Sequence, residues 1–235
     1  MVTFSIYYGF TFEDNSEERF HLQIDLQRCE LVDNLQETLP TWTQLTFHQC
    51  PHCPLQPETH PHCPLAANLA DIITKFSRFL PYEKTYLTVI TEERQILEET
   101  TIQAAVGSLM GVVSATSGCP YMAYFKPMAR FHLPLASTEE TIFRSVSMYL
   151  MAQYFLQKEG REVDFTLKGL AQIYENTHTV NTTMAERFLA ASKNDSSIDA
   201  VVQLDIYAMT FLGILDEPLE ELRPLFNAFF SKDTV

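Results

Sequence analysis

Residues 48–65 read HQCPHCPLQPETHPHCPL and form the densest group of metal-binding side chains in the sequence. They include three of the five cysteines and four of the seven histidines of the 235-residue chain, together with five prolines. The unit Pro-His-Cys-Pro-Leu occurs twice, at 51–55 and 61–65, and another Cys-Pro pair begins at Cys119. Thiolate and imidazole groups are the usual protein ligands of zinc and of iron in clusters. The stretch therefore predicts a metal site.

The composition excludes several classes of function. Sixteen basic and thirty acidic side chains give a formal charge of −14, and such a surface repels a phosphate backbone, so nucleic-acid binding is not expected. No apolar run is long enough for a membrane span, and the N-terminus MVTFSIYYGF lacks the basic segment of a secretion signal. We expect a soluble cytoplasmic protein, in which clustered thiols are metal ligands or catalytic groups more often than disulfides.

The N-terminal part of the chain reads as strands. Residues 3–10 and 18–26 are rich in β-branched and aromatic residues and flank a polar turn, and residues 84–91 and 94–101 flank a Glu-Glu turn. Each pair predicts an antiparallel hairpin, and the four strands predict one sheet. A further short strand is expected over residues 44–48, directly before the cysteine loop 48–65.

From residue 102 onward the pattern is helical. Pro64 marks the first position of an earlier helix over 66–80, and residues 102–116 predict a helix buried on most sides. The later helices are expected over 137–158, which begins with a Ser-x-x-Glu capping box, and over 166–191, 198–215 and 218–230. The prediction is an α+β fold in a single compact domain over 1–235. Residues 1–101 are mostly β with the cysteine loop and its helix inserted between the hairpins, and residues 102–235 form an all-helical bundle.

Four cysteines followed by proline make a candidate ligand set: Cys50, Cys53, Cys63 and Cys119. Four thiolates suit an iron-sulfur cluster or tetrahedral zinc. The cluster is the first interpretation, because proline follows each ligand and because three ligands are close together while one is distant. Cys63 is expected at a helix N-terminus, where the helix dipole lowers the pKa of a thiol.

Other interpretations of the loop stay open. His60 or His62 could replace a cysteine as a zinc ligand, since zinc accepts imidazole readily. A Cys-Pro thiolate can also bind haem iron, although four such pairs fit haem less well. The alternative without any cofactor is that these are ordinary buried thiols in a loop stiffened by proline.

A second set of polar residues lies outside the loop. Arg130 and His132 precede a predicted helix, and Tyr174 and His178 share one face of another at i and i+4. Near the metal loop these residues would suit an enzyme acting on a small anionic substrate, with Arg130 holding the anion and a histidine moving the proton. A satisfied polar network inside a helical bundle is the more common role of such residues. The chain has no phosphate-binding Gly-rich loop, nucleophile elbow or His-Glu-x-x-His motif.

The segments HQCPHCPL, HPHCPLAANL, ATSGCP and MARFHLPLASTEET resemble a family of bacterial proteins known as a domain of unknown function. The resemblance runs from His48 to His178 and includes the same four Cys-Pro units. It implies a bacterial cytoplasmic protein and brings no activity.

The residues themselves predict a metal-centre protein whose iron-sulfur cluster serves electron transfer or redox sensing. A structural zinc protein that binds a partner is the alternative, and the acidic helical half would favour a basic protein partner. Catalysis is the third hypothesis.

Overall fold

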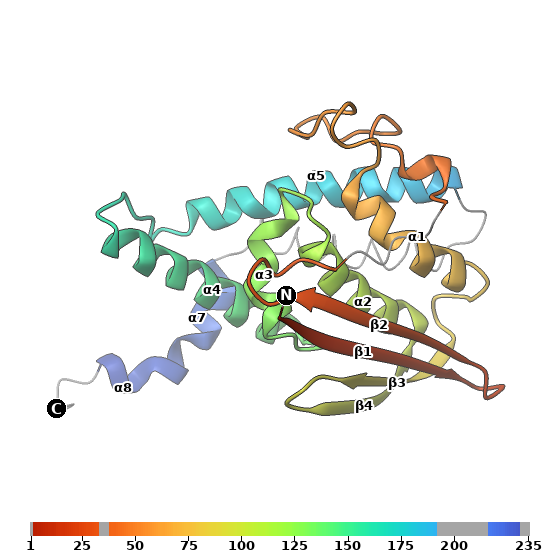
Figure 1. Cartoon of the computed structure of the whole chain (residues 1–235). Coiled ribbons are helices and arrows are strands. Elements are labelled where there is room, and N and C mark those ends of the chain that lie inside the picture. The colour runs from red at the N-terminus through yellow and green to blue at the C-terminus, as the bar shows by residue number, and fades with distance from the viewer. Residues whose placement is uncertain (1, 33–37, 192–215, 231–235) are drawn as a thin grey trace.

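The computed structural model describes residues 2–32, 38–191 and 216–230. Its N-terminal half contains one antiparallel sheet with the strand order β2-β1-β3-β4 (Figure 1). The strands are β1 (Thr3–Phe12), β2 (Glu17–Asp25), β3 (Lys84–Ile90) and β4 (Gln95–Thr101). Both predicted hairpins are confirmed, and the segment between them carries the cysteine loop.

The sheet forms because one face of each inner strand is apolar. In β1, Phe4, Ile6, Tyr8 and Phe10 point to the same side and are nearly inaccessible to solvent. The register places Tyr8 opposite Phe20 of β2 and opposite Val89 of β3, so the apolar residues of three strands meet on one face. Burying each such side chain contributes about 1.5–3 kcal/mol relative to leaving it exposed.

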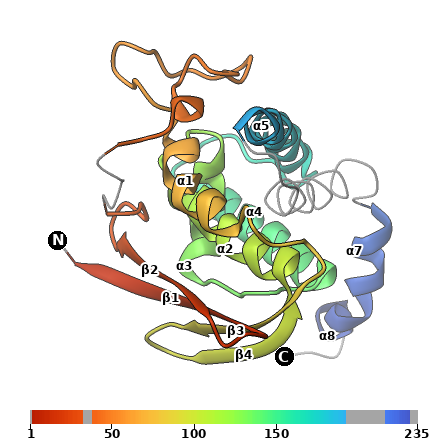
Figure 2. The ribbon, with the colours of Figure 1, turned by 90° about the vertical axis from the view of Figure 1, so that its right-hand side faces the viewer.

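Two helices cover this apolar face of the sheet. They are α1 (Pro64–Phe76) and α2 (Ile102–Thr116), and Figure 2 shows them between the sheet and the long helix α5 (Lys168–Ala191). Pro64 is the first residue of α1, as predicted, with Cys63 as its N-cap. Helix α2 begins where Thr101 caps the backbone N–H of Ala104, and it is buried along most of its length. The predicted buried helix over 102–116 is confirmed.

The C-terminal half is helical in the part that the structure describes. Ser137 and Glu140 form the predicted capping box at the start of α4. The helix predicted over 218–230 is broken, because Pro224 has no N–H for a continuous helical ladder. The helix predicted over 198–215 lies outside the described residues. The elements are η2 (Met122–Phe125), α3 (Lys126–Arg130), α4 (Thr138–Lys158), α5 (Lys168–Ala191), α7 (Asp216–Leu222), η3 (Arg223–Phe226) and α8 (Asn227–Phe230).

The strand predicted over 44–48 is wrong. The chain forms the 3-10 helix η1 (Thr41–Thr43) and then a single bridge between Gln44 and His62. His48 has a φ of 45°, which a strand does not accommodate. None of the described helices has the length and apolar character needed to cross a membrane. The α+β fold is confirmed, and its division into domains stays a prediction.

Candidate metal centre

The cysteine loop is closed at its base by backbone hydrogen bonds. The N–H of Leu45 donates to the carbonyl of Pro61 at 2.9 Å, and the N–H of Cys63 donates to that of Thr43 at 2.8 Å. Between these residues the chain runs through turns and projects beyond α1 and α5 (Figure 1, orange). The loop is therefore attached to the body mainly at its base and where its tip touches other elements.

The Cys50–Cys53 turn docks onto the turn that follows α2. The N–H of Cys53 donates to the carbonyl of Cys50 at 3.0 Å, which closes the Cys-x-x-Cys unit as a β-turn. The ring of His52 lies on that of Tyr121 with 4.0 Å between centroids, and the Tyr121 hydroxyl donates to the His52 carbonyl at 2.8 Å. Tyr121 is two residues beyond Cys119, so this contact brings the local cysteines to the distant one.

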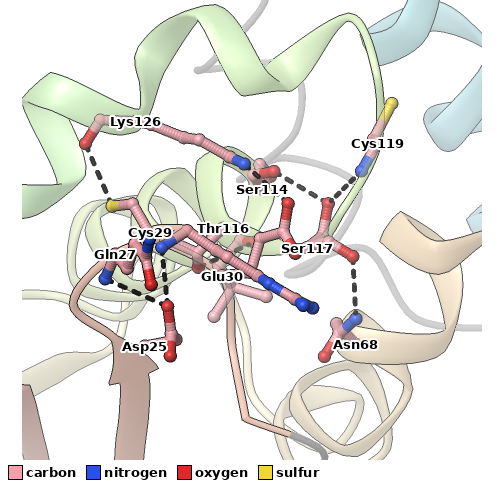
Figure 3. Close-up of polar contacts among 12 residues, drawn as sticks. Asp25, Gln27, Cys29, Glu30, Asn68, Ser114, Thr116, Ser117, Cys119 and Lys126 are labelled. Atoms are coloured by element: carbon pink, nitrogen blue, oxygen red, sulfur yellow. Dashed lines mark hydrogen bonds and ion pairs between the residues drawn. The ribbon is translucent and has the colours of Figure 1, made fainter. Parts of the chain in front are cut away.

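A second contact brings Cys119 toward the start of α1. Gly118 has a φ of +88°, and its Cα faces Pro64, whose Cβ lies 3.9 Å from the place of a glycine Cβ. The Ser117 hydroxyl accepts from the N–H of Cys119 at 3.2 Å and donates to the carbonyl of Ser114 at 2.8 Å (Figure 3). The end of α2 thus holds Cys119 beside the N-cap of α1, which is Cys63.

The electrostatics agree with this convergence. The pKa of Cys119 is raised to about 12, chiefly by burial and further by the neighbouring Cys63 and Cys50. Burial also raises the pKa of Cys50 and of Cys63, and the nearby Cys53 raises both pKa values further. The expected low pKa of Cys63 is wrong: the N–H groups at the start of α1 do lower it, but loss of hydration outweighs them.

Arg187 of α5 is a central residue of this region that sequence reasoning missed. Its guanidinium is buried and donates to the carbonyls of Trp42 and Gln44 at 2.8 and 2.9 Å, and to that of Leu45 at 3.2 Å. Its charge also lowers the pKa of Cys50 and of Cys63, which opposes the effect of burial. The available signal was an arginine between the apolar Met184 and Phe188 on a core-facing part of the helix.

Cys29 stands apart from this group, as its missing proline suggested. It has a φ of 51°, and its thiol donates to the carbonyl of Lys126 at 3.4 Å. Its charged neighbours are Lys126, Arg130 and Glu30. Figure 3 shows the sulfur of Cys119 pointing away from Cys29.

The histidines of the loop make other contacts. Nδ1 of His60 lies 2.9 Å from the Thr59 hydroxyl, and Nδ1 of His62 lies 2.7 Å from that of Thr43. Over residues 2–32, 38–191 and 216–230, no three His, Cys, Asp or Glu side chains are already arranged to hold a metal ion. A four-thiolate centre would require the four sulfurs to close in on the metal.

Of the four polar candidates outside the cysteine loop, two line a cavity of about 470 Å³. His132 and Tyr174 line it, whereas Arg130 and His178 are not among its described lining residues. Arg130 lies 3.9 Å from a carboxylate oxygen of Glu93, and its guanidinium stacks over the ring of Phe4. Among the described lining residues the cation is Arg144, which sequence reasoning did not select. No cysteine belongs to the described lining, so the cavity and the cysteine group are separate sites.

A family model described as a domain of unknown function (DUF6901) matches residues 6–227. The chain belongs to this family. All four Cys-Pro units, Arg187 and the cavity lie within the matched residues of DUF6901. Comparisons with curated proteins and with solved structures found no match. Membership of DUF6901 brings no activity with it, so function must be argued from the two sites.

Proposed function

We propose that this DUF6901 protein is a metal-centre protein in which Cys50, Cys53, Cys63 and Cys119 supply four thiolate ligands. An iron-sulfur cluster is the preferred occupant and Zn²⁺ the alternative. The observation that supports the proposal is the docking of the Cys50–Cys53 turn on the Cys119 turn through His52 and Tyr121. That contact holds the turn with Cys50 and Cys53 against the turn that follows Cys119, and Gly118 approaches Pro64 next to Cys63.

The surroundings of the thiols suit an anionic centre. Four thiolates leave a net charge of about −2 around Zn²⁺ or a doubly charged cluster. Arg187 places a buried positive charge beside three of them, and backbone N–H groups of Ala66 and Met122 stabilise the thiolates of Cys63 and Cys119. N–H donors toward sulfur and a nearby cation are features that adjust the potential of a cluster.

The proposed role is electron transfer or redox sensing. Cys50, Cys53 and Cys119 are half-buried rather than enclosed, so a centre there would lie near the surface. We place the protein in the cytoplasm, whose reducing conditions keep thiols available for a metal. With zinc the centre would instead brace the loop as a surface for a partner protein, and the acidic chain would favour a basic partner.

Anaerobic purification followed by metal and sulfide analysis and a visible spectrum tests the proposal. The expected result is a coloured protein with iron and acid-labile sulfide in equal amounts. A colourless protein with one zinc per chain would select the alternative. A protein that takes up neither zinc nor a cluster when incubated anaerobically with zinc, or with ferrous iron and sulfide, would overturn the metal centre itself.

A further inference from the structure

The cavity beside α2 is open because small residues line one face of that helix. Ala104, Gly107, Gly111 and Ala115 recur at spacings of three and four and all border it. They span eleven steps of the helix, or about 16 Å at 1.5 Å per residue. The cavity is therefore elongated along α2, with α3, α4 and α5 contributing its other walls.

Apolar side chains form part of the remaining wall, beside threonines, serines and a few other polar residues. Val112, Met122, Phe125, Leu133 and Leu135 border the space. Apolar walls with a few polar groups are typical of small-molecule sites, where the apolar surface supplies affinity and the polar groups fix orientation. An occupant of this cavity needs an apolar body.

Arg144 supplies a positive charge on the cavity wall. Both of its hydrogen bonds to described residues use Nη2, which donates to the carbonyls of Met128 and Phe131 at 2.9 Å. No carboxylate in the described part of the chain forms an ion pair with it; the nearby Glu140 is held by the N–H of Ser137 at 2.8 Å. Nη1 and Nε are thus available to an anionic ligand.

Two further polar side chains lie on the cavity. Nε2 of His132 is hydrogen-bonded to the Tyr8 hydroxyl, which is in turn hydrogen-bonded to the Ser108 hydroxyl at 2.9 Å. Asn181 is 5% exposed, and its amide nitrogen has no hydrogen-bond partner within the described structure. Among the described lining residues the single carboxylate is Glu98, an exposed residue of β4. Donors therefore outnumber acidic acceptors on this wall.

We propose that the cavity binds a small-molecule carboxylate with an apolar body, its carboxylate held by Arg144. The apolar part would extend along the small-residue face of α2, and an acceptor atom on it would pair with Asn181. A guanidinium matches a carboxylate in both charge and geometry. This inference does not depend on the metal centre, since no described lining residue is a cysteine.

Calorimetric titration of the purified full chain tests the inference with three probes: decanoate, 4-phenylbutanoate and decan-1-ol. At least one of the two acids should bind. Decanoate should bind roughly 10- to 100-fold more tightly than decan-1-ol, because the acid has a charged acceptor and the alcohol of the same chain length does not. Failure of both acids to bind, or equal binding of decanoate and decan-1-ol, would overturn the proposal. Metal content plays no part in either readout.

Variants of Arg144 identify the group that binds the carboxylate. Arg144→Gln should weaken the binding of decanoate by roughly 10- to 100-fold and leave the binding of decan-1-ol unchanged. Arg161→Gln, at an exposed position, should change neither affinity. Because Gln could disturb the contacts to Met128 and Phe131, Arg144→Lys is tested as well; its retained charge should preserve part of the affinity. Unchanged binding by a folded Arg144→Gln protein would reject this site.

Discussion

Cys119 and Cys29 are both half-buried thiols, yet their surroundings differ. Cys119 lies beside the N-cap of α1 and is influenced by Cys63 and Cys50, whereas the thiol of Cys29 donates to the carbonyl of Lys126. Cys119→Ser should therefore abolish most of the metal content, measured by elemental analysis after anaerobic purification. Cys29→Ser keeps a donor for Lys126 and should bind as much metal as the parent protein. Equal losses in the two variants would contradict the proposed ligand set.

Arg187 connects α5 to the base of the cysteine loop. Its removal would leave the buried carbonyls of Trp42 and Leu45 without this donor, and an unpaired buried polar group costs about 1–3 kcal/mol; the Gln44 carbonyl still accepts from the N–H of Phe47. Arg187→Gln should lower the free energy of unfolding by about 2–4 kcal/mol in urea titrations. Arg161→Gln, at an exposed site, serves as the control and should have little effect. A stability loss for Arg187→Gln no larger than that of the control would show that the buried contacts are unimportant.

His132 should make stability depend on pH. Burial, and then the charge of Arg144, lowers the pKa of His132 from 6.5 to about 3. Between these values the unfolded histidine binds a proton that the folded one does not, so the free energy of unfolding falls by about 1.4 kcal/mol for each pH unit of acidification. His132→Gln keeps a polar group that can hydrogen-bond to Tyr8 and should remove this part of the slope. Urea titrations at pH 7 and pH 5 measure the difference; parallel profiles of the two proteins would contradict it.

At the scale of an element, the turn after α2 depends on Gly118. Its φ of +88° disfavours any side chain, although an added Cβ would meet Pro64 at an ordinary 3.9 Å. Gly118→Ala should therefore cost about 1–2 kcal/mol through the backbone alone. The turn would shift, and the metal content should fall with it because Cys119 is the next residue.

Gly160 provides a matched control for this turn. Its φ is +71° and nothing lies within 4 Å of an added Cβ. Gly160→Ala should cost a similar amount of stability, measured by urea titration, and leave the metal content unchanged. Similar metal losses in both variants would mean that reduced stability, rather than the Cys119 turn, controls binding.

At the scale of the whole molecule, metal should rigidify one part of the chain. The sheet has its own paired strands and buried apolar face, whereas the cysteine loop is tied to the body by a few contacts at its base and tip. Chelation should lower the melting temperature and accelerate amide hydrogen exchange in residues 48–62, with little change in β1 and β3. Uniform acceleration across the sheet would point instead to a metal that supports the whole fold.

The local elements of this protein follow from its sequence. Runs of β-branched and aromatic residues around polar turns indicate the four strands, Pro64 and the Ser137–Glu140 pair mark the starts of helices, and the Cys-Pro repeat singles out four thiols. These signals act between residues a few positions apart, so they are visible before the chain folds. The strand prediction over residues 44–48 failed because this segment runs in turns and has no neighbouring strand to pair with, although its apolar residues still contact the core.

The partners of the functional side chains depend on tertiary structure. Arg187 meets backbone carbonyls about 140 positions earlier in the chain, and Arg144, rather than Arg130, borders the cavity. The first outcome depends on how α5 packs against η1 and the second on how α4 packs against α3, and both are decided by the packing of side chains from distant segments. No periodicity within one helix carries that information, since a helix repeats its faces without specifying what will lie against them.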